Sequence, residues 1–230
     1  MEQPLIQLAG VTKRYRDGSG EVLALKDINL AIAPNSKVVV MGPSGSGKST
    51  LLQIIGGLDK ASEGEVTVGG KALATLGDKE LSDYRGEYIG FIFQTFNLQA
   101  HLSAEENVAL PLILSGMGER AANEQARHAL EKVGMAEKAG RFPAQLSGGE
   151  MQRVAIARAI VHNPKVILAD EPTANLDKAN AENVLELLKG LDLAGQALVI
   201  VTHDDRVAER FERVVSLDHG ELVKDETKAQ

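Results

Sequence analysis

The stretch Gly42-Pro43-Ser44-Gly45-Ser46-Gly47-Lys48-Ser49-Thr50 matches the pattern G-x-x-x-x-G-K-[ST] and decides the fold. An apolar run typical of a strand precedes it at residues 38–41, and a run typical of a helix follows at residues 51–55. Strand, glycine loop and helix in this order are the context in which the pattern binds phosphate. The N–H groups of such a loop and the positive end of the helix dipole point toward one anion. Lys48 can reach the outer phosphates, and the Ser49 hydroxyl can bind Mg²⁺.

The composition restricts the class of protein. The chain has 230 residues, of which 43% are hydrophobic, so we expect one large domain or one domain with an inserted lobe. The net charge is −7 and basic blocks are absent, which disfavours nucleic acid as a partner. The chain lacks cysteine, which excludes disulfides and thiol chemistry. It shows neither a signal-peptide pattern nor an apolar run near the roughly 18 residues of a membrane span, so we expect a separate partner to hold it at any membrane.

Strands are predicted on both sides of the phosphate loop, with no helix among them apart from the one that follows the loop. They are predicted at residues 5–11 and 22–32, joined by a turn at 17–20, and at residues 63–70, where a short strand ends in a turn. The helix after the loop is predicted to run to about residue 58. This order indicates a small antiparallel sheet beside the main one.

The next part of the chain is predominantly helical. After a helix at residues 78–87 and a strand at 89–93, capping boxes at Ser103 and Ser147 open helices that run to residue 114 and to about residue 162. A third helix is predicted at residues 119–133. We interpret residues 95–162 as a helical lobe inserted into an α/β core formed by residues 1–94 and 163–230.

The core resumes with strands at residues 166–169, 197–201 and 214–217 and helices at 178–191 and 206–211. Alternating strands and helices with short loops predict a parallel sheet covered by helices on both faces. The polar tail from Lys224 is predicted to fray.

Two adjacent carboxylates, Asp170 and Glu171, end an apolar strand. Neighbours on a strand point to opposite faces, so we expect the two to serve different purposes. At the carboxyl end of a parallel strand an Asp can hold Mg²⁺, and the next acid can orient or deprotonate water. The structural alternative is an acidic turn before Pro172.

Four further features have both a functional and a structural interpretation. The element Ser147-Gly148-Gly149-Glu150 is a second candidate anion site or a structural capping box. As an anion site it poses a difficulty, because it lies on the lobe and would have to reach the nucleotide bound by the phosphate loop. The other three are single side chains: Tyr15 could stack on a base or be a half-buried loop tyrosine, Gln94 ends a strand and could cap a loop, and His203 ends another strand and could be structural.

Together these residues resemble the ATP-binding-cassette (ABC) ATPases over nearly the whole chain. The correspondence is Tyr15 with the adenine-stacking aromatic, residues 42–50 with Walker A, Gln94 with the Q-loop, Leu146–Glu150 with the signature motif, residues 166–171 with Walker B, residues 175–177 with the D-loop, and His203 with the switch histidine. The resemblance implies a P-loop NTPase (RecA-like) α/β core with an antiparallel β subdomain and an inserted α-helical subdomain.

The resemblance also implies the activity and its cofactors. ATP is hydrolysed with Mg²⁺, which Ser49, Gln94 and Asp170 contact. Glu171 polarises the attacking water, His203 contacts the γ-phosphate together with Lys48, and Gln94 couples the site to a membrane partner. Two cassettes pack head to tail as a homodimer, with each ATP between one Walker A and the other chain's signature element. That arrangement removes the difficulty of two distant anion sites.

Residues 89–98 and 171–177 are similar to the cassettes of macrolide exporters and lipoprotein-releasing systems (MacB and LolD types). Those usually carry glycine where this chain has Ala174, and the signature ends in Glu150 rather than the commoner Gln. We expect a transporter ATPase beneath separate transmembrane permease subunits, peripheral on the cytoplasmic face of the inner membrane. A cassette of the FtsE type, which signals through a membrane protein to cell-wall hydrolases, is the alternative. A DNA-repair ATPase would need a long coiled-coil insert, which the sequence lacks.

Overall fold

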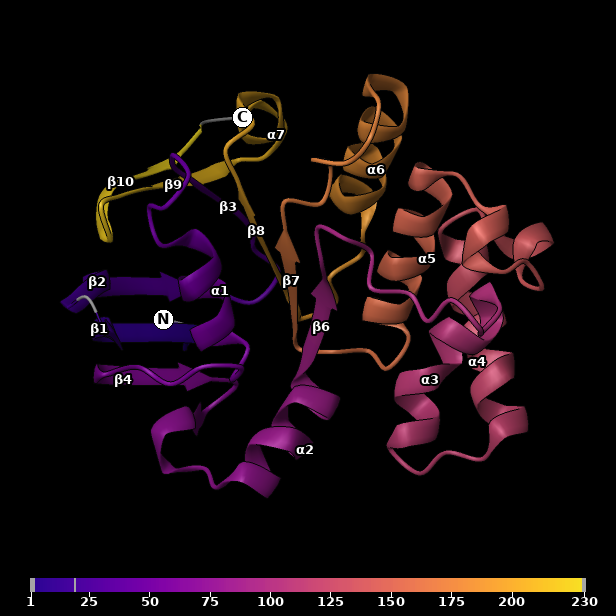
Figure 1. Ribbon diagram of the computed structural model, residues 1–230, viewed down its shortest axis with the longest axis horizontal. Helices are drawn as coiled ribbons and strands as arrows, with labels where there is room; N and C mark the ends of the chain where they lie inside the picture. The colour runs from indigo at the N-terminus through magenta and orange to yellow at the C-terminus, as the bar shows by residue number, and fades with distance from the viewer. Residues whose placement is uncertain (1–2, 19, 229–230) are drawn as a thin grey trace. The chain divides into compact units, whose positions relative to one another are not determined.

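The computed structural model describes residues 3–18 and 20–228 as two compact units (Figure 1). The first unit comprises Met1–Arg85 and Asp192–Gln230, and the second comprises Gly86–Leu191. Ser19, which belongs to the predicted turn at 17–20, lies outside the described residues. Among the described residues, none of the helices combines the length and the apolar character needed to cross a membrane.

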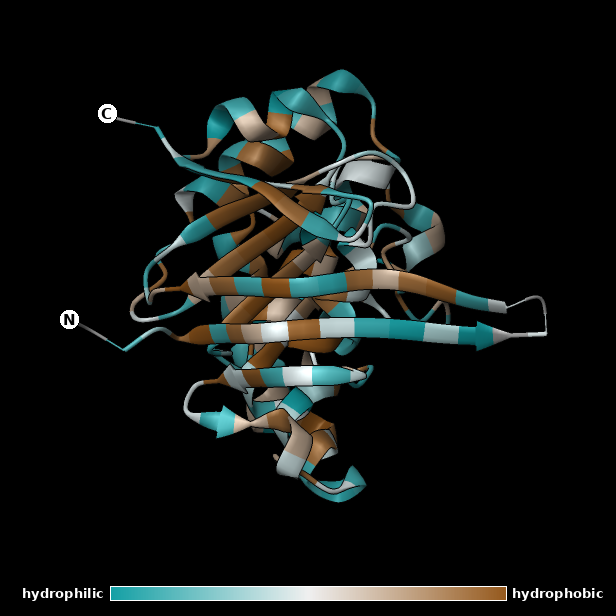
Figure 2. Cartoon of the chain, turned by 90° about the vertical axis from the view of Figure 1, so that its left-hand side faces the viewer, coloured by the Kyte–Doolittle hydropathy of each residue, from teal (hydrophilic) through white to brown (hydrophobic). Residues whose placement is uncertain are grey.

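Four strands of the first unit form the predicted antiparallel sheet, in the order β2-β1-β4-β5. They are β1 (Ile6–Asp17), β2 (Gly20–Ile32), β4 (Glu63–Val68) and β5 (Lys71–Ala72). β1 is longer than predicted, because the charged stretch after residue 11 continues to pair with β2. Figure 2 shows this pair as a long hairpin in which β1 becomes hydrophilic toward the far end, whereas β2 stays hydrophobic almost to the turn.

The second sheet of this unit has the order β10-β9-β3-β8. Its strands are β3 (Lys37–Met41), β8 (Ala197–Thr202), β9 (Arg213–Asp218) and β10 (Glu221–Thr227). β3 pairs in parallel with both β8 and β9, as predicted. The central part of β3 and all of β8 are buried, which explains their continuous apolar sequences.

The prediction that the tail frays from Lys224 is wrong. β10 continues to Thr227 and pairs antiparallel with β9. The Arg213 guanidinium on β9 also donates to both carboxylate oxygens of Asp225, at 2.9 and 2.7 Å. Almost every residue of β10 is exposed, so backbone pairing rather than an apolar face holds the strand, and its polar sequence does not reveal it.

Helix α1 (Lys48–Ile55) ends about three residues earlier than predicted, because α2 (Asp78–Tyr88) caps its C-terminus. The buried Tyr84 hydroxyl donates to the Ile55 carbonyl at 2.7 Å, and Arg85 donates to the Gly57 carbonyl at 2.9 Å. These bonds satisfy carbonyls that another turn of helix would otherwise have used. α7 (Asp205–Arg210) completes the helices of the first unit.

The second unit combines a parallel strand pair with four helices. β6 (Ile89–Ile92) pairs with β7 (Val166–Asp170). The helices are α3 (Ala104–Leu114), α4 (Glu119–Lys132), α5 (Gly148–Ile160) and α6 (Lys178–Gly190). Short 3₁₀ turns lie at Ala136–Lys138 and Pro143–Gln145 in this unit and at Leu73–Thr75 in the first unit.

Helix α5 is the centre of the second unit. It contacts α3, α4, α6 and β6, and apart from the buried Gln152 its interior positions are small or branched apolar residues. A Cβ at Gly90 of β6 would lie 2.0 Å from the Ala159 carbonyl oxygen, so strand and helix meet backbone to backbone there. The capping boxes predicted at Ser103 and Ser147 are confirmed. The bounds 95–162 of the helical lobe stay a prediction.

Candidate functional site

The glycine loop lies between β3 and α1, and packing against two other strands fixes its path. A Cβ at Gly42 would lie 2.1 Å from the Leu217 carbonyl oxygen of β9. Gly47 has φ +101°, and a Cβ there would lie 2.4 Å from the Ala24 carbonyl oxygen of β2. Any side chain at either position would overlap backbone, so the pattern's first and last glycines are required by the fold itself.

The start of α1 is suited to an anion. Within residues 3–18 and 20–228, no side chain caps this helix, and its first turn contains no acidic residue. By contrast, side chains of Ser103, Ser147, Asp177 and Asp204 cap α3, α5, α6 and α7. The N–H groups and the positive dipole end of α1 therefore face the loop without an acceptor from an N-cap side chain.

Lys48 and Ser46 place polar groups inside the loop. The Lys48 side chain is buried, and its ammonium donates to the carbonyls of Gly42 and Pro43, both at 2.8 Å. The Ser46 hydroxyl is also buried and has no hydrogen-bond partner in the described part of the chain. A bound anion would supply an acceptor for both groups.

His203 lies beside this loop. It follows β8, is exposed, and lines an open pocket of about 330 Å³ together with Met41, Gly42, Pro43, Asp205, Ser216, Leu217, Asp218 and Val223. The next residue, Asp204, caps α7 and accepts hydrogen bonds from the Arg206 guanidinium, which lowers the pKa of its carboxyl group. His203 thus shares a pocket with the first residues of the loop.

Tyr15 lies near the start of α1 and is held by groups that the sequence did not indicate. Its hydroxyl donates to Asp59 at 2.7 Å, and the Lys13 ammonium lies 4.7 Å from its ring centroid. Burial is the main cause that raises the pKa of Tyr15, the bond to Asp59 adds to it, and hydrogen bonding with Thr50 opposes it. The side chain is 38% exposed, so part of it is open to a ligand.

In the second unit, Asp170 is the last residue of β7, and Glu171 has already left the strand. Glu171 has φ +46°, in the left-handed region that costs a non-glycine residue about 1–2 kcal/mol. Glu171 therefore lies outside the alternation of side chains that was expected from a strand ending in two carboxylates. Residues held in such a conformation cluster at functional sites.

The signature element forms the N-terminus of α5. The Ser147 hydroxyl accepts from the Glu150 N–H at 3.4 Å, and Glu150 accepts from the Ser147 N–H at 2.9 Å and pairs with Lys138. The Lys138 hydrogen bond is the main cause that lowers the pKa of Glu150. Residues 147–150 therefore form the capping box of the structural interpretation, and their role in binding an anion stays a prediction.

Gln94 is exposed just after β6, and two other loops of the second unit contact its surroundings. Asn175 donates to the Gln94 carbonyl at 2.9 Å. A Cβ at Gly148 would lie 3.4 Å from Leu176 and 3.9 Å from Phe96. The Q-loop, D-loop and signature positions therefore gather in one unit, a grouping to which no single local pattern in the sequence points.

The predicted Mg²⁺ ligands have suitable chemistry. A serine hydroxyl, an amide oxygen and a carboxylate, from Ser49, Gln94 and Asp170, are hard oxygen donors. The described residues contain no cluster of three or more histidines, cysteines or carboxylates that could hold a metal without help. Mg²⁺ in proteins generally keeps several waters and is bound through one or two carboxylates together with substrate phosphates.

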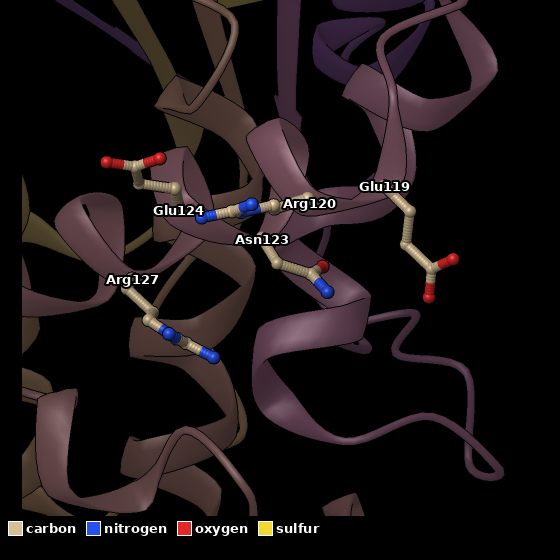
Figure 3. Close-up of a pocket in the computed structure, with 5 residues that line it drawn as sticks. All are labelled: Glu119, Arg120, Asn123, Glu124 and Arg127. Carbon is tan, nitrogen blue, oxygen red and sulfur yellow. The ribbon is translucent and has the colours of Figure 1, made fainter.

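A hollow of about 610 Å³ has none of these motif residues in its lining (Figure 3). Its lining consists of Glu119, Arg120, Asn123, Glu124 and Arg127, all on α4. Arg127 also pairs with Glu105 of α3 at 2.8 Å. The hollow is the mixed-charge face of one helix, where the Asn123 side-chain oxygen is buried without a hydrogen-bond partner among the described residues.

These features define a P-loop nucleotide-binding protein: a buried parallel strand, a glycine loop with a lysine inside it, and a helix that starts without a side-chain cap. A family model described as "ABC transporter" matches residues 25–174. The chain belongs to the ABC transporter family, as an ATP-binding cassette, which confirms the family predicted from the sequence.

Two curated relatives and one solved structure place the chain more closely. It is 48% identical to the lipoprotein-releasing system ATP-binding protein LolD of Legionella pneumophila (strain Paris), over 91% of this chain and 93% of the relative. It is 44% identical to a probable export ATP-binding/permease protein MacB of Pseudomonas entomophila, over 97% of this chain but 33% of that longer relative.

The solved structure is a dimeric post-hydrolysis state of the cassette MJ0796 bound to ADP and Pi. It matches with a TM-score of 0.89 and 45% identity, over 98% of this chain and 99% of that chain. This match confirms the predicted fold class, a P-loop α/β core with an antiparallel β subdomain and a helical subdomain, and it agrees with the ATPase assignment.

Proposed function

We propose that this cassette hydrolyses ATP to drive a membrane permease in lipoprotein release or export, as the names of its LolD and MacB relatives suggest. The observation that carries the proposal is the loop at α1, where a helix start without a side-chain cap and a buried lysine form a ready site for phosphate. The named relatives supply the transport context, and the site supplies the chemistry.

In this proposal the residues divide the work. The loop N–H groups of residues 42–50 and the Lys48 ammonium bind the β- and γ-phosphates and neutralise the charge that develops during transfer. Tyr15 stacks on the base. Mg²⁺ supplies additional charge neutralisation when bound, held by Ser49, Asp170 and Gln94. Glu171 orients and deprotonates the attacking water, and His203 contacts the γ-phosphate.

The functional unit in this proposal is a homodimer. Ser147, Gly148, Gly149 and Glu150 of one chain meet the nucleotide bound by the loop of the other, head to tail. The dimeric MJ0796 structures support a dimer as the assembled form. Transmembrane permease subunits then hold the pair at the inner face of the cell membrane, and residues 95–162 move as the helical subdomain.

Two variants test the proposal. Lys48→Ala should abolish ATP binding in calorimetry, because it removes the cation inside the loop, whereas Lys79→Ala on the exposed surface of α2 should bind like wild type. An affinity for ATP that survives Lys48→Ala would refute the phosphate site.

Ser147→Arg tests the dimer arrangement. The arginine would occupy the position from which the signature element of one chain contacts the ATP bound to the other chain. ATP hydrolysis, measured as release of inorganic phosphate, should therefore stop, while ATP binding to the monomer stays intact. A hydrolysis rate equal to that of wild type would remove the signature element from the site.

A further inference from the structure

Helix α5 carries both the signature element and the Arg158 side chain. Its N-terminus presents the signature element at Ser147, and Arg158 lies about three turns further along. The Arg158 guanidinium donates to two consecutive backbone carbonyls, from Nη2 to Phe96 at 2.8 Å and from Nη1 to Asn97 at 2.5 Å. These carbonyls belong to the segment that directly follows Gln94.

The backbone of the segment that Arg158 contacts, residues 95–97, has an unusual conformation. Phe96 has φ +58° and Asn97 has φ +50°, so two consecutive non-glycine residues adopt the left-handed conformation. Asparagine tolerates this region, but phenylalanine does not favour it. The Asn97 N–H donates to the Thr95 carbonyl at 2.6 Å, and the Thr95 hydroxyl donates to the Asn97 side chain at 2.9 Å. The turn is therefore tight and strained, and we expect it to depend on contacts from outside the turn.

If Arg158 served only to pack against this turn, a partly buried charge would be an unfavourable choice. The Arg158 side chain is only partly exposed, and this burial lowers the pKa of its guanidinium. An apolar side chain would fill the space with a smaller desolvation penalty. The planar fork of N–H donors, however, binds the two adjacent carbonyls from two separate nitrogens in a fixed geometry, whereas an apolar side chain cannot donate and an ammonium would donate to both from one nitrogen.

We propose that Arg158 is a positioning residue that holds the turn at Phe96 and Asn97, and so keeps Gln94 in a fixed relation to the signature helix. The Phe96 ring supports the link, since its tip lies 3.9 Å from the β position of Gly148. α5 and the Q-loop then move together, and any displacement of the signature element is passed to Gln94. The inference rests on the proposed function, in which Gln94 acts on Mg²⁺ and on the permease.

The test compares turnover with binding. Arg158→Met should lower kcat for ATP hydrolysis about tenfold or more, because it misplaces Gln94, which lies far from the substitution along the chain. ATP affinity, measured by calorimetry, should stay within about twofold of wild type, since the phosphate loop is untouched. Arg158→Lys should give an intermediate kcat, because an ammonium lacks the fork.

Exposed Asn97 provides variants that leave the α5 packing intact. Asn97→Val should reproduce the loss of kcat, because a β-branched residue resists positive φ, whereas Asn97→Gly should keep wild-type activity. The double variant Arg158→Met with Asn97→Gly should regain part of the lost kcat, which a merely structural role of Arg158 does not predict.

Three results would overturn the inference: wild-type kcat in Arg158→Met, wild-type kcat in Asn97→Val, or a fall in ATP affinity as large as the fall in kcat. The wild-type control separates failure of the proposed function from failure of this inference. If the wild-type chain does not hydrolyse ATP, the proposed function fails, and if it hydrolyses ATP while Arg158→Met does so equally, this inference alone fails.

Discussion

Replacing Gly47 with alanine should destabilise the fold even when no nucleotide is present. Gly47 and Gly45 both lie in the phosphate loop and both have positive φ, at +101° and +80°. Their surroundings differ. A Cβ at Gly47 would lie 2.4 Å from the Ala24 carbonyl oxygen and 2.9 Å from the Leu25 side chain, whereas at Gly45 the described residues leave open space within 4 Å. Gly45→Ala is therefore a matched control.

The magnitude follows from separating strain from overlap. Alanine in the left-handed region costs about 1–2 kcal/mol, and this cost is common to both variants. Overpacking costs a further 1–3 kcal/mol, roughly, and applies to Gly47→Ala alone, because a backbone carbonyl in a paired strand cannot move aside as a side-chain tip can. We expect Gly47→Ala to be less stable than Gly45→Ala by about 1–3 kcal/mol.

Urea unfolding followed by circular dichroism, in buffer without nucleotide or Mg²⁺, measures the difference without the contribution of ligand binding. In thermal melts the two variants should differ by about 2–4 °C for each kcal/mol. Equal stability of Gly47→Ala and Gly45→Ala would show that β2 does not constrain the loop, and that its final glycine serves phosphate alone.

Two further predictions concern carboxylates. Glu171→Gln should bind ATP but fail to activate water, so light scattering should show an ATP-stabilised dimer; a variant that stays monomeric with ATP would contradict the assigned role. Glu150 has a folded-state pKa below its ordinary value of 4.5, so its contribution to stability is present above that value and lost as the pH falls through the folded pKa. Glu150→Gln should therefore be less stable than wild type near pH 7 by roughly 0.3–1 kcal/mol, with the difference shrinking below about pH 4.5, and a difference that is constant with pH would argue against the charged pairing with Lys138.

The parts of the fold that were predictable from sequence have local causes. The strand before the glycine loop is a continuous apolar run because β3 is buried, and the capping boxes at Ser103 and Ser147 are complete within four residues. Such signals are present in the residues that form the element, so they survive without knowledge of the neighbours.

The parts that escaped prediction depend on residues far apart in the chain. β10 forms because β9 offers an edge, and α1 ends at Ile55 because Tyr84, 29 residues later, takes its carbonyl. The same holds for the site. Asp59 meets Tyr15 across 44 residues, and Arg158 meets Phe96 across 62. The positive φ of Glu171 is likewise imposed by its surroundings, since nothing in its own residue type favours it.

The position of Tyr15 is suited to an introduced optical reporter of nucleotide binding. The chain has no tryptophan and three tyrosines, and Tyr15 has Asp59 and Lys13 on one side and the start of the nucleotide helix nearby. Tyr15→Trp would therefore carry a single indole at the rim of the phosphate loop. Its emission would follow nucleotide arrival and departure in real time, without an attached dye, in the cassette alone or in a complex whose other chains contain no tryptophan.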